Sequence, residues 1–494
     1  MEPLESLCSN LLSRISCTTF LASFVGGLNL MGLKIIHELD RPSGNTSKME
    51  KSEFYRNKII LAPMVRIGTL PMRLLSLDYG ADIVYSEELI DWKLLRCERK
   101  VNDVLNTVDF IDTTDGSVVF RTCDKEKDRV VLQIGTCDPE RALKAAKLVE
   151  KDVAGIDINM GCPKEFSVKG GMGAALLKQR DKAQGILTKL VNGLEIPVSC
   201  KIRVFETAED TVEFGKAMEA TGISAIAVHG RTRDERPQHD NHNDRIRAVA
   251  KALTIPVIAN GGSKEIEKYT DLERFRKDCN ASSVMVARAA EWDCSIFRKE
   301  GRLPIDTVIS SYLRYAVDYD NADGNTKYCV QNMLRDRQDS EFGRTFHETQ
   351  TNEQICALWN IADYCRQKER DLRERGLIGR REMQALGPKK RKLDDDIVQV
   401  PCIFQRNLYA DDTDLPKARL LLWTRRKRLG QPVYDTIQFE RQFQSIVTVD
   451  RKKYSSSCWE KNKRSAEHSA ALACLCSFGL VDTHSLKNNG SIIY

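Results

Sequence analysis

The chain has 494 residues, of which 41% are hydrophobic and 30% are charged. This composition excludes a mainly disordered chain and is typical of one large apolar core with smaller domains attached. The net charge of +6 originates at the C-terminal end, since the segment from Pro416 onward holds 14 Lys and Arg against 6 Asp and Glu, whereas the remainder holds 62 against 64. A basic excess confined to one segment indicates a polyanionic partner, most commonly nucleic acid.

The first 50 residues contain an uncharged stretch over residues 15–33, which five Ser, Thr and Asn residues dilute. Such a stretch is a poor membrane span, so no stable membrane association is expected. Residues 1–50 are interpreted as an extension, either disordered or targeting the protein to an organelle. The 16 cysteines form no CxxC pairs and no zinc-type spacing. They predict reduced thiols in an intracellular protein and no metal site.

Short β-branched runs then alternate with helix-compatible segments. Helices are expected at 139–149, 181–192, 207–221 and 244–253, and eight strand candidates begin at Lys58, Ala81, Val130, Gly155, Pro197, Ala225, Pro256 and Ser283. Near-continuous apolar strands separated by helices predict an α/β fold, a closed TIM-type (β/α)8 barrel over residues 51–303. An open doubly wound sheet is the alternative, but no GxGxxG follows its first strand.

Small and polar residues follow most of these strands, at the end where a barrel places its chemistry. Gly261 and Gly262 follow the seventh strand, and Ala287 and Arg288 follow the eighth. Backbone N–H groups at glycines and a guanidinium are what a phosphate requires, although two glycines alone can equally form a tight turn.

Three further strand residues point to the same end of the barrel. Lys201 could stabilise the negative charge of a reduced isoalloxazine ring, and Gln133 could pair with the pyrimidine edge of the ring. His229 alone is more often a core histidine, and Lys201 alone often reaches solvent. The coincidence of these residues at successive strand ends predicts a flavin site.

Cys162 lies in the segment NMGCPKEFSVKGGMGAALL, on a turn after the fourth strand and before a glycine-rich loop. A thiol with an ordinary pKa near 8.5 is protonated at neutral pH, so it can give a proton to a developing carbanion. A buried turn cysteine without a function is the alternative.

The strings APMVRIGTLPMR, NMGCP, GGMGAALL, KIR, HGRTR, NGG and VMVARAA resemble the dihydrouridine synthase family over residues 58–298. The resemblance implies an FMN-binding barrel, NADPH or NADH as electron source, hydride transfer to C6 of a uracil in tRNA, and protonation of C5 by Cys162. The FMN contacts that it implies are Pro63, Met64, Val65, Gln133, Lys201, His229, Asn260, Gly261, Gly262, Ala287 and Arg288. Many members have glycine where Ala287 stands, and the segment DERPQHDNHND departs from the commoner pattern.

Residues 304–380 carry apolar residues at helical spacing over 310–319, 327–336 and 354–373. The family resemblance implies a helical tRNA-binding domain here. A linker is expected over 381–414, and its PKKRK at 388–392 resembles a nuclear-import signal, with a basic tRNA contact as an equal alternative.

Residues 415–480 are expected to form a helix, three strands and a helix, followed by a tail over 481–494. This order resembles a double-stranded-RNA-binding domain, and the resemblance implies phosphate contacts by Lys463 and Arg464, with Lys461 nearby. Leu422 stands where a glutamate that contacts the minor groove is common, and the loop at 440–442 is short. The combination of domains resembles eukaryotic family members that act on position 20 of the tRNA D-loop.

Two other classes of protein are alternatives. One is an FMN oxidoreductase acting on a free pyrimidine, of the dihydroorotate or dihydropyrimidine type, and the other is a non-catalytic RNA-binding protein on a barrel scaffold. The protein is expected to be a cytoplasmic monomer, with nuclear or organellar localisation as alternatives.

Overall fold

The computed structural model describes residues 48–380, 396–409, 411–439, 442–488 and 491–492. Residues 1–47 of the N-terminal extension, the PKKRK segment and residues 440–441 of the short loop lie outside this range, whereas residues 48–50 begin α2 (Lys48–Glu53). Among the described helices, none has the length and apolarity needed to cross a membrane.

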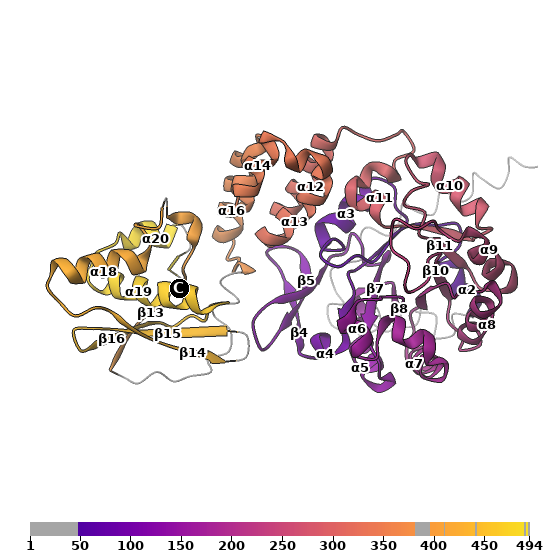
Figure 1. The fold of residues 1–494 in the computed structure, drawn as a ribbon, viewed down its shortest axis with the longest axis horizontal. Coiled ribbons are helices and arrows are strands. Elements are labelled where there is room, and N and C mark those ends of the chain that lie inside the picture. Colours follow the sequence, from indigo (N-terminus) through magenta and orange to yellow (C-terminus); the bar gives the residue numbers. More distant parts are fainter. Residues whose placement is uncertain (1–47, 381–395, 410, 440–441, 489–490, 493–494) are drawn as a thin grey trace, which may run out of the picture. The chain divides into compact units, whose positions relative to one another are not determined.

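Eight parallel strands form a closed barrel (Figure 1), as predicted. The barrel closes because β2 pairs with β1 on one side and with β7 on the other. The strands are β1 (Ile59–Leu61), β2 (Ile83–Tyr85), β7 (Val130–Gly135), β8 (Gly155–Met160), β9 (Val198–Arg203), β10 (Ala225–His229), β11 (Val257–Asn260) and β12 (Ser283–Val286). Each coincides with one of the strand candidates.

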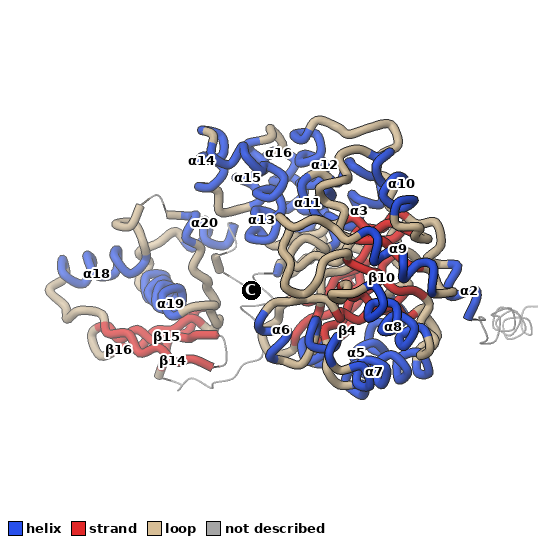
Figure 2. The backbone as a smooth tube through the Cα atoms, turned by 45° about the vertical axis from the view of Figure 1, so that its right-hand side comes forward, coloured by secondary structure: helices blue, strands red, loops and turns tan. Residues whose placement is uncertain are grey.

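The strands are almost entirely buried, since barrel side chains face either the packed interior or the outer helices. Figure 2 shows helices around the outside of the red strands. The helices that follow the barrel strands include α3 (Leu70–Asp78), α5 (Pro139–Val149), α7 (Arg180–Gly193), α8 (Ala208–Glu219), α9 (Asn243–Ala252), α10 (Tyr269–Asp278) and α11 (Arg288–Trp292). Helix α5 begins where Asp138 accepts a hydrogen bond from the Arg141 backbone and Pro139 occupies the first turn.

An insertion that was not predicted separates β2 from β7. It contains β3 (Leu89–Ile90), α4 (Asp91–Leu95) and an antiparallel sheet of β4 (Cys97–Asn102), β5 (Thr107–Asp112) and β6 (Val118–Thr122). Buried ion pairs anchor it. Arg73 of α3 binds Glu126 at 2.6 Å, and Arg121 of β6 binds Asp109 of β5 at 2.6 Å.

Within residues 304–380, five α-helices follow the barrel: α12 (Ile305–Asp318), α13 (Asp323–Leu334), α14 (Glu341–Glu348), α15 (Asn352–Leu358) and α16 (Ala362–Glu374). The guanidinium of Arg66 stacks over the Tyr328 ring at 4.0 Å, which joins the loop after β1 to α13. The helical spacing expected over 354–373 is divided between two helices, α15 and α16. The chain turns at Asn360, whose φ of 58° is incompatible with a continuing helix.

The C-terminal domain contains α18 (Pro416–Arg426), β14 (Val433–Phe439), β15 (Gln442–Val449), β16 (Lys452–Ser456) and α19 (Lys463–Ser477) in the predicted order. Leu420, Val447 and Leu475 belong to its apolar core, between the helices and one face of the sheet. Figures 1 and 2 both show α18 and α19 on that face.

The C-terminal domain extends beyond the expected range of 415–480. Strand β13 (Ile397–Val400), expected as linker, pairs in parallel with β16, so Ile397 lies opposite Lys453. Cys402 also bridges to Ile492 of the expected tail, beyond the short helix α20 (Thr483–Asn488). The added strand covers an edge of the sheet and satisfies its free backbone groups.

Candidate active site

A cavity of about 420 Å³ lies at the carboxyl ends of β10, β11 and β12 and beside the loop that follows β8. Of the predicted site residues, it is lined by Cys162, His229, Asn260, Gly261, Gly262, Ala287 and Arg288. Three strand ends and one loop, distant in sequence, thus meet around one cavity. The carboxyl end of a barrel is where this fold places active sites.

The glycine corner is tightly constrained. Gly261 has a φ of 110°, and a Cβ at this residue would lie 2.1 Å from Oδ1 of Asn241 and 2.6 Å from Cδ2 of His229. Its carbonyl oxygen accepts a hydrogen bond from Nη1 of Arg231 at 2.7 Å. A residue with a side chain therefore cannot replace Gly261 without local rearrangement.

The cavity is positively charged. Four arginines line it, together with one lysine and one glutamate: Arg203, Arg231, Arg236, Arg288, Lys164 and Glu235. Burial lowers the pKa of His229 well below its ordinary value, and the nearby cations lower it further. His229 is therefore neutral at physiological pH, and the excess of positive charge suits an anionic ligand such as a phosphate.

Gln133 and Lys201 do not line the cavity but lie in the barrel interior next to it. Nε2 of Gln133 donates to Asp157 at 2.8 Å, and Oε1 accepts from Asn159 at 3.2 Å, so both ends of the amide are held. Burial lowers the pKa of Lys201 to about 8, although the negative charge of Asp157 opposes this shift. Lys201 interacts electrostatically with His229 and Cys162, both of which line the cavity.

The loop that carries Cys162 is held by its neighbours. Oδ1 of Asn159 accepts from the backbone N–H of Gly161 at 2.9 Å and of Cys162 at 3.0 Å. The Cys162 carbonyl oxygen accepts from the Ala174 N–H at 2.9 Å. Burial raises the pKa of the Cys162 thiol, and the charge of Glu88 raises it further. The sulfur is therefore protonated at neutral pH.

The three residues after β1 lie outside the cavity lining. Pro63 and Met64 are half-buried, and 45% of Val65 is exposed. Strand β1 pairs with β12, and Arg288 follows β12, so these three residues lie at the end of the strand next to β12.

Sequence reasoning did not assign a site role to Arg203, Arg231, Arg236 or Glu235, although the strings KIR and HGRTRDERPQ carry them.

Lys461, Lys463 and Arg464 are all exposed, and the last two begin α19. Asn462 caps this helix by accepting from the Ser465 N–H at 2.9 Å. Cations at a helix N-terminus, together with its free N–H groups, can bind phosphates. Leu422 of α18 is 45% exposed and offers no polar group for the minor-groove contact that its position commonly makes.

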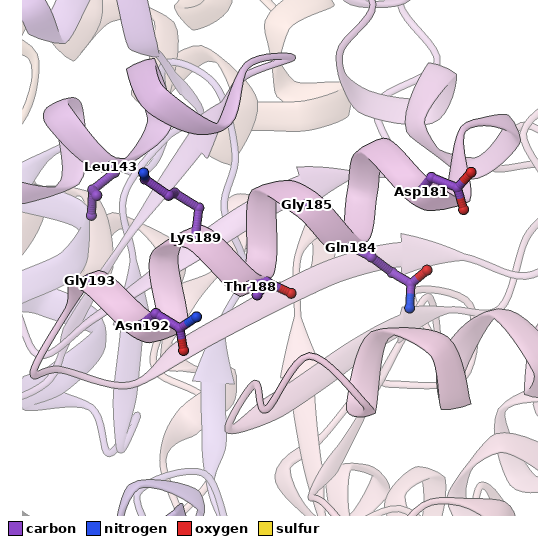
Figure 3. Close-up of a pocket in the computed structure, with 8 residues that line it drawn as sticks. All are labelled: Leu143, Asp181, Gln184, Gly185, Thr188, Lys189, Asn192 and Gly193. Atoms are coloured by element: carbon purple, nitrogen blue, oxygen red, sulfur yellow. The ribbon is translucent and has the colours of Figure 1, made fainter.

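A second hollow of about 760 Å³ lies on the outside of the barrel (Figure 3). It is lined by Leu143 of α5 and by Asp181, Gln184, Gly185, Thr188, Lys189, Asn192 and Gly193 of α7. None of the predicted site residues lines it, and it is not at the carboxyl ends of the strands. It is therefore not the candidate active site despite its larger volume.

The fold and the cavity define a TIM-barrel protein with a positively charged pocket and a protonated thiol, which carries a separate α-β-β-β-α domain with exposed cations. The dihydrouridine synthase family model matches residues 60–338, and the double-stranded RNA binding motif matches residues 416–477. The chain belongs to the dihydrouridine synthase family and is an oxidoreductase of that family with a double-stranded-RNA-binding domain.

Among its relatives, a tRNA-dihydrouridine(20) synthase [NAD(P)+] of Schizosaccharomyces pombe is 43% identical over 57% of this chain and 60% of its own length. The Saccharomyces cerevisiae protein of the same name is 37% identical over 57% of this chain and 78% of its own length. A crystal structure of a tRNA-dihydrouridine(20) synthase dsRBD domain is 45% identical, covers 17% of this chain and 89% of that domain, and has a TM-score of 0.16.

Proposed function

We propose that this protein reduces uridine 20 in the D-loop of tRNA to 5,6-dihydrouridine, with bound FMN and with NADPH or NADH as the electron source. The observation that carries the proposal is the protonated thiol of Cys162 beside a cationic, glycine-lined cavity at the carboxyl end of a dihydrouridine synthase barrel. The names of the two yeast relatives support position 20.

The cavity residues fit FMN. Gly261, Gly262 and Arg288 would hold the phosphate, because they combine backbone N–H groups with a guanidinium in a cavity with more cations than anions. Lys201, half-buried and near the cavity, would lie beside the isoalloxazine ring. When bound, FMN would take up a hydride from the nicotinamide and deliver it to C6 of the uracil.

Hydride addition to C6 of the uracil leaves an electron pair and a negative charge at C5, which is delocalised onto the adjacent C4 carbonyl. Cys162 supplies the proton: its S–H bond breaks, a C–H bond forms at C5, and the thiolate regains a proton from solvent. A general acid must hold its proton at the working pH, as the raised pKa of Cys162 ensures. Lys201 would stabilise the negative charge during the transfer.

The C-terminal domain would hold the tRNA. Lys461, Lys463 and Arg464 are exposed, so their charges can reach the phosphates of a short stem. Because β13 belongs to the same sheet, a deletion that removes the whole domain must begin before Ile397.

The test is to incubate the purified protein with NADPH and a tRNA transcript and to map dihydrouridine along the transcript. Dihydrouridine at position 20 is expected. Cys162→Ala should lower turnover by a factor on the order of 10² to 10⁴, the usual contribution of a general acid, while flavin content and its reduction by NADPH are retained.

Cys137→Ala is the matched control. Cys137 is half-buried, and its sulfur lies about 4.0 Å from the Cβ position of Gly171 on the loop after Cys162. Its Sγ accepts only from Arg141 among the described contacts, at 3.3 Å. This variant should keep full activity. Normal turnover by Cys162→Ala would contradict the proposal. So would a protein that acts on free uracil or dihydroorotate and not on tRNA. A purified protein without flavin would favour a non-catalytic RNA-binding role.

A further inference from the structure

Burial is the largest influence on the Cys162 thiol and favours its neutral form, whereas the cations around it favour the thiolate. Lys164 follows it on the same loop, and Lys201 and Arg203 of β9 interact with its sulfur. Nearby cations stabilise a thiolate and lower the pKa of a cysteine, often below 7. A thiolate cannot serve as a proton donor. The cations that suit an anionic cofactor therefore act against the retention of the proton on Cys162.

Glu88 lies in the short segment between β2 and β3. Strand β3 pairs with β7, so that Leu89 lies opposite Ile134 and Ile90 opposite Gly135. Oε1 of Glu88 lies 2.6 Å from the position that a Cβ would occupy at Gly135. The glycine therefore leaves the space that this carboxyl group fills.

The Glu88 side chain interacts with the side chains of Cys162 and Asn159. Oε1 is buried and has no hydrogen-bond partner among the described residues. Burial raises the pKa of Glu88 to about 7, and the side chains of Cys162 and Asn159 and the charge of Lys164 oppose this shift. The charge of Glu88 in turn raises the pKa of Cys162. The two groups are therefore coupled.

We propose that Glu88 is a positioning residue for the catalytic acid, whose carboxylate accepts the Cys162 S–H and keeps the sulfur protonated among the surrounding cations. This inference rests on the proposed function of Cys162. The groups that interact with the Cys162 side chain in the described part of the chain are Lys164 of its own loop, Ser167 of α6 (Glu165–Lys169), Lys201 and Arg203 of β9, and Glu88. Of these, Glu88 is the acid that offsets the cations.

Two consequences follow for the chemistry. A carboxylate close to the sulfur makes loss of the thiol proton less favourable, because two negative charges would then lie together. As an acceptor it also fixes the direction of the S–H bond until a stronger base, the developing carbanion, approaches. Glu88 need not contact the substrate for either effect.

The experiment measures the reactivity of the Cys162 sulfur without tRNA. The flavin-loaded protein and its Glu88→Gln variant are treated with iodoacetamide at pH 6 to 10, and alkylation of the Cys162 peptide is followed by mass spectrometry. Glu88→Gln should move the pH midpoint of alkylation to lower pH. A displacement of about one pH unit would raise the thiolate fraction at pH 7.5 about tenfold. Glu88→Asp should retain most of the wild-type midpoint because it keeps the negative charge.

Glu165→Gln is the matched control, since Glu165 lies three residues from Cys162 in sequence. Its side chain is 78% exposed and pairs with Lys169, so solvent screens its charge and the midpoint should not move. Flavin absorbance and melting temperature establish that each variant is folded. An unchanged alkylation midpoint in folded Glu88→Gln would overturn the proposal.

A second measurement links the thiol to turnover. In Glu88→Gln, the decline of tRNA reduction at high pH should begin at lower pH, by the same displacement as the alkylation midpoint. A uniform loss of activity at every pH with an unchanged midpoint would identify a merely structural role for Glu88 and refute the inference. Failure of the proposed function gives a different result, namely normal turnover in Cys162→Ala, and does not affect the alkylation midpoint.

Discussion

Replacing Gly261 by alanine is the most direct test of the phosphate corner. At this position φ is 110°, in a region that residues with a side chain rarely adopt. The new Cβ would lie 2.1 Å from Oδ1 of Asn241 and 2.6 Å from Cδ2 of His229, whereas real contacts of a Cβ are longer than 3 Å. The backbone cannot move away freely, because the carbonyl oxygen of Gly261 is bound by buried Arg231 at 2.7 Å.

The magnitude follows from these contacts. Strained backbone conformations of this kind cost about 1–3 kcal/mol, and displacement of His229 or Asn241 adds to that cost. Since each 1.4 kcal/mol corresponds to a tenfold change in an equilibrium constant, Gly261→Ala should weaken FMN binding by roughly tenfold or more. Flavin fluorescence during dilution or titration measures the dissociation constant directly.

Gly185→Ala is the matched control, since Gly185 lies within α7 and nothing lies within 4 Å of its Cβ position. Alanine within a helix is favoured over glycine by about 0.5–1 kcal/mol, so this variant should melt at a slightly higher temperature with unchanged flavin affinity. If Gly261→Ala binds FMN as tightly as the wild type does, the glycine corner does not hold the phosphate and the assignment of the site is wrong.

Three further outcomes are expected. Lys201→Met should slow the reduction of the flavin by NADPH. In the wild type the rate of this reduction should fall as pH rises through about 8, because Lys201 loses its charge above that pKa. A rate that is independent of pH from 7 to 9 would exclude this role. Replacing Lys463 and Arg464 by alanine should reduce the salt slope of tRNA binding by about two units, measured by titration from low to high salt, and an unchanged slope would mean that other residues bind the phosphates. Arg73→Met should destabilise the barrel by about 3–5 kcal/mol in denaturant unfolding, because it leaves a buried carboxylate unpaired. The same change at Arg56, which is half-buried and pairs with exposed Glu53, should cost less than about 1 kcal/mol.

The barrel could be predicted because its signal is local. Each strand is buried on both sides, so it reads as a short continuous apolar run such as VVLQIG from Val130. The same holds for the order of elements in the C-terminal domain and for α5, where Asp138 and Pro139 mark the helix start in the sequence itself. Cys162 and the glycines at 261 and 262 stand at strand ends, and strand ends of a parallel barrel meet at one rim.

Several strands of the insertion and of the C-terminal domain escaped prediction. Strand β4, CERKVN, is largely exposed and highly charged, so no alternation distinguishes it from a loop, and its pairing with β5 defines it as a strand. Strand β13 likewise exists because the edge of β16 is available to it. The break at Asn360 interrupts an otherwise helical pattern, and tertiary packing of α15 and α16 selects the turn.

The sequence by itself determined the closed barrel, the C-terminal domain and the residues at the strand ends. The spacing of apolar residues and the ends of strands can both be recognised from residues that are adjacent in the chain. The tertiary structure decided which charges face each other. Gln133 is oriented by Asp157, Gly261 is held by Arg231, and Glu88 reaches Cys162 across 74 residues of chain. Such pairs leave no local pattern, since electrostatic coupling depends on distance and burial in the folded chain.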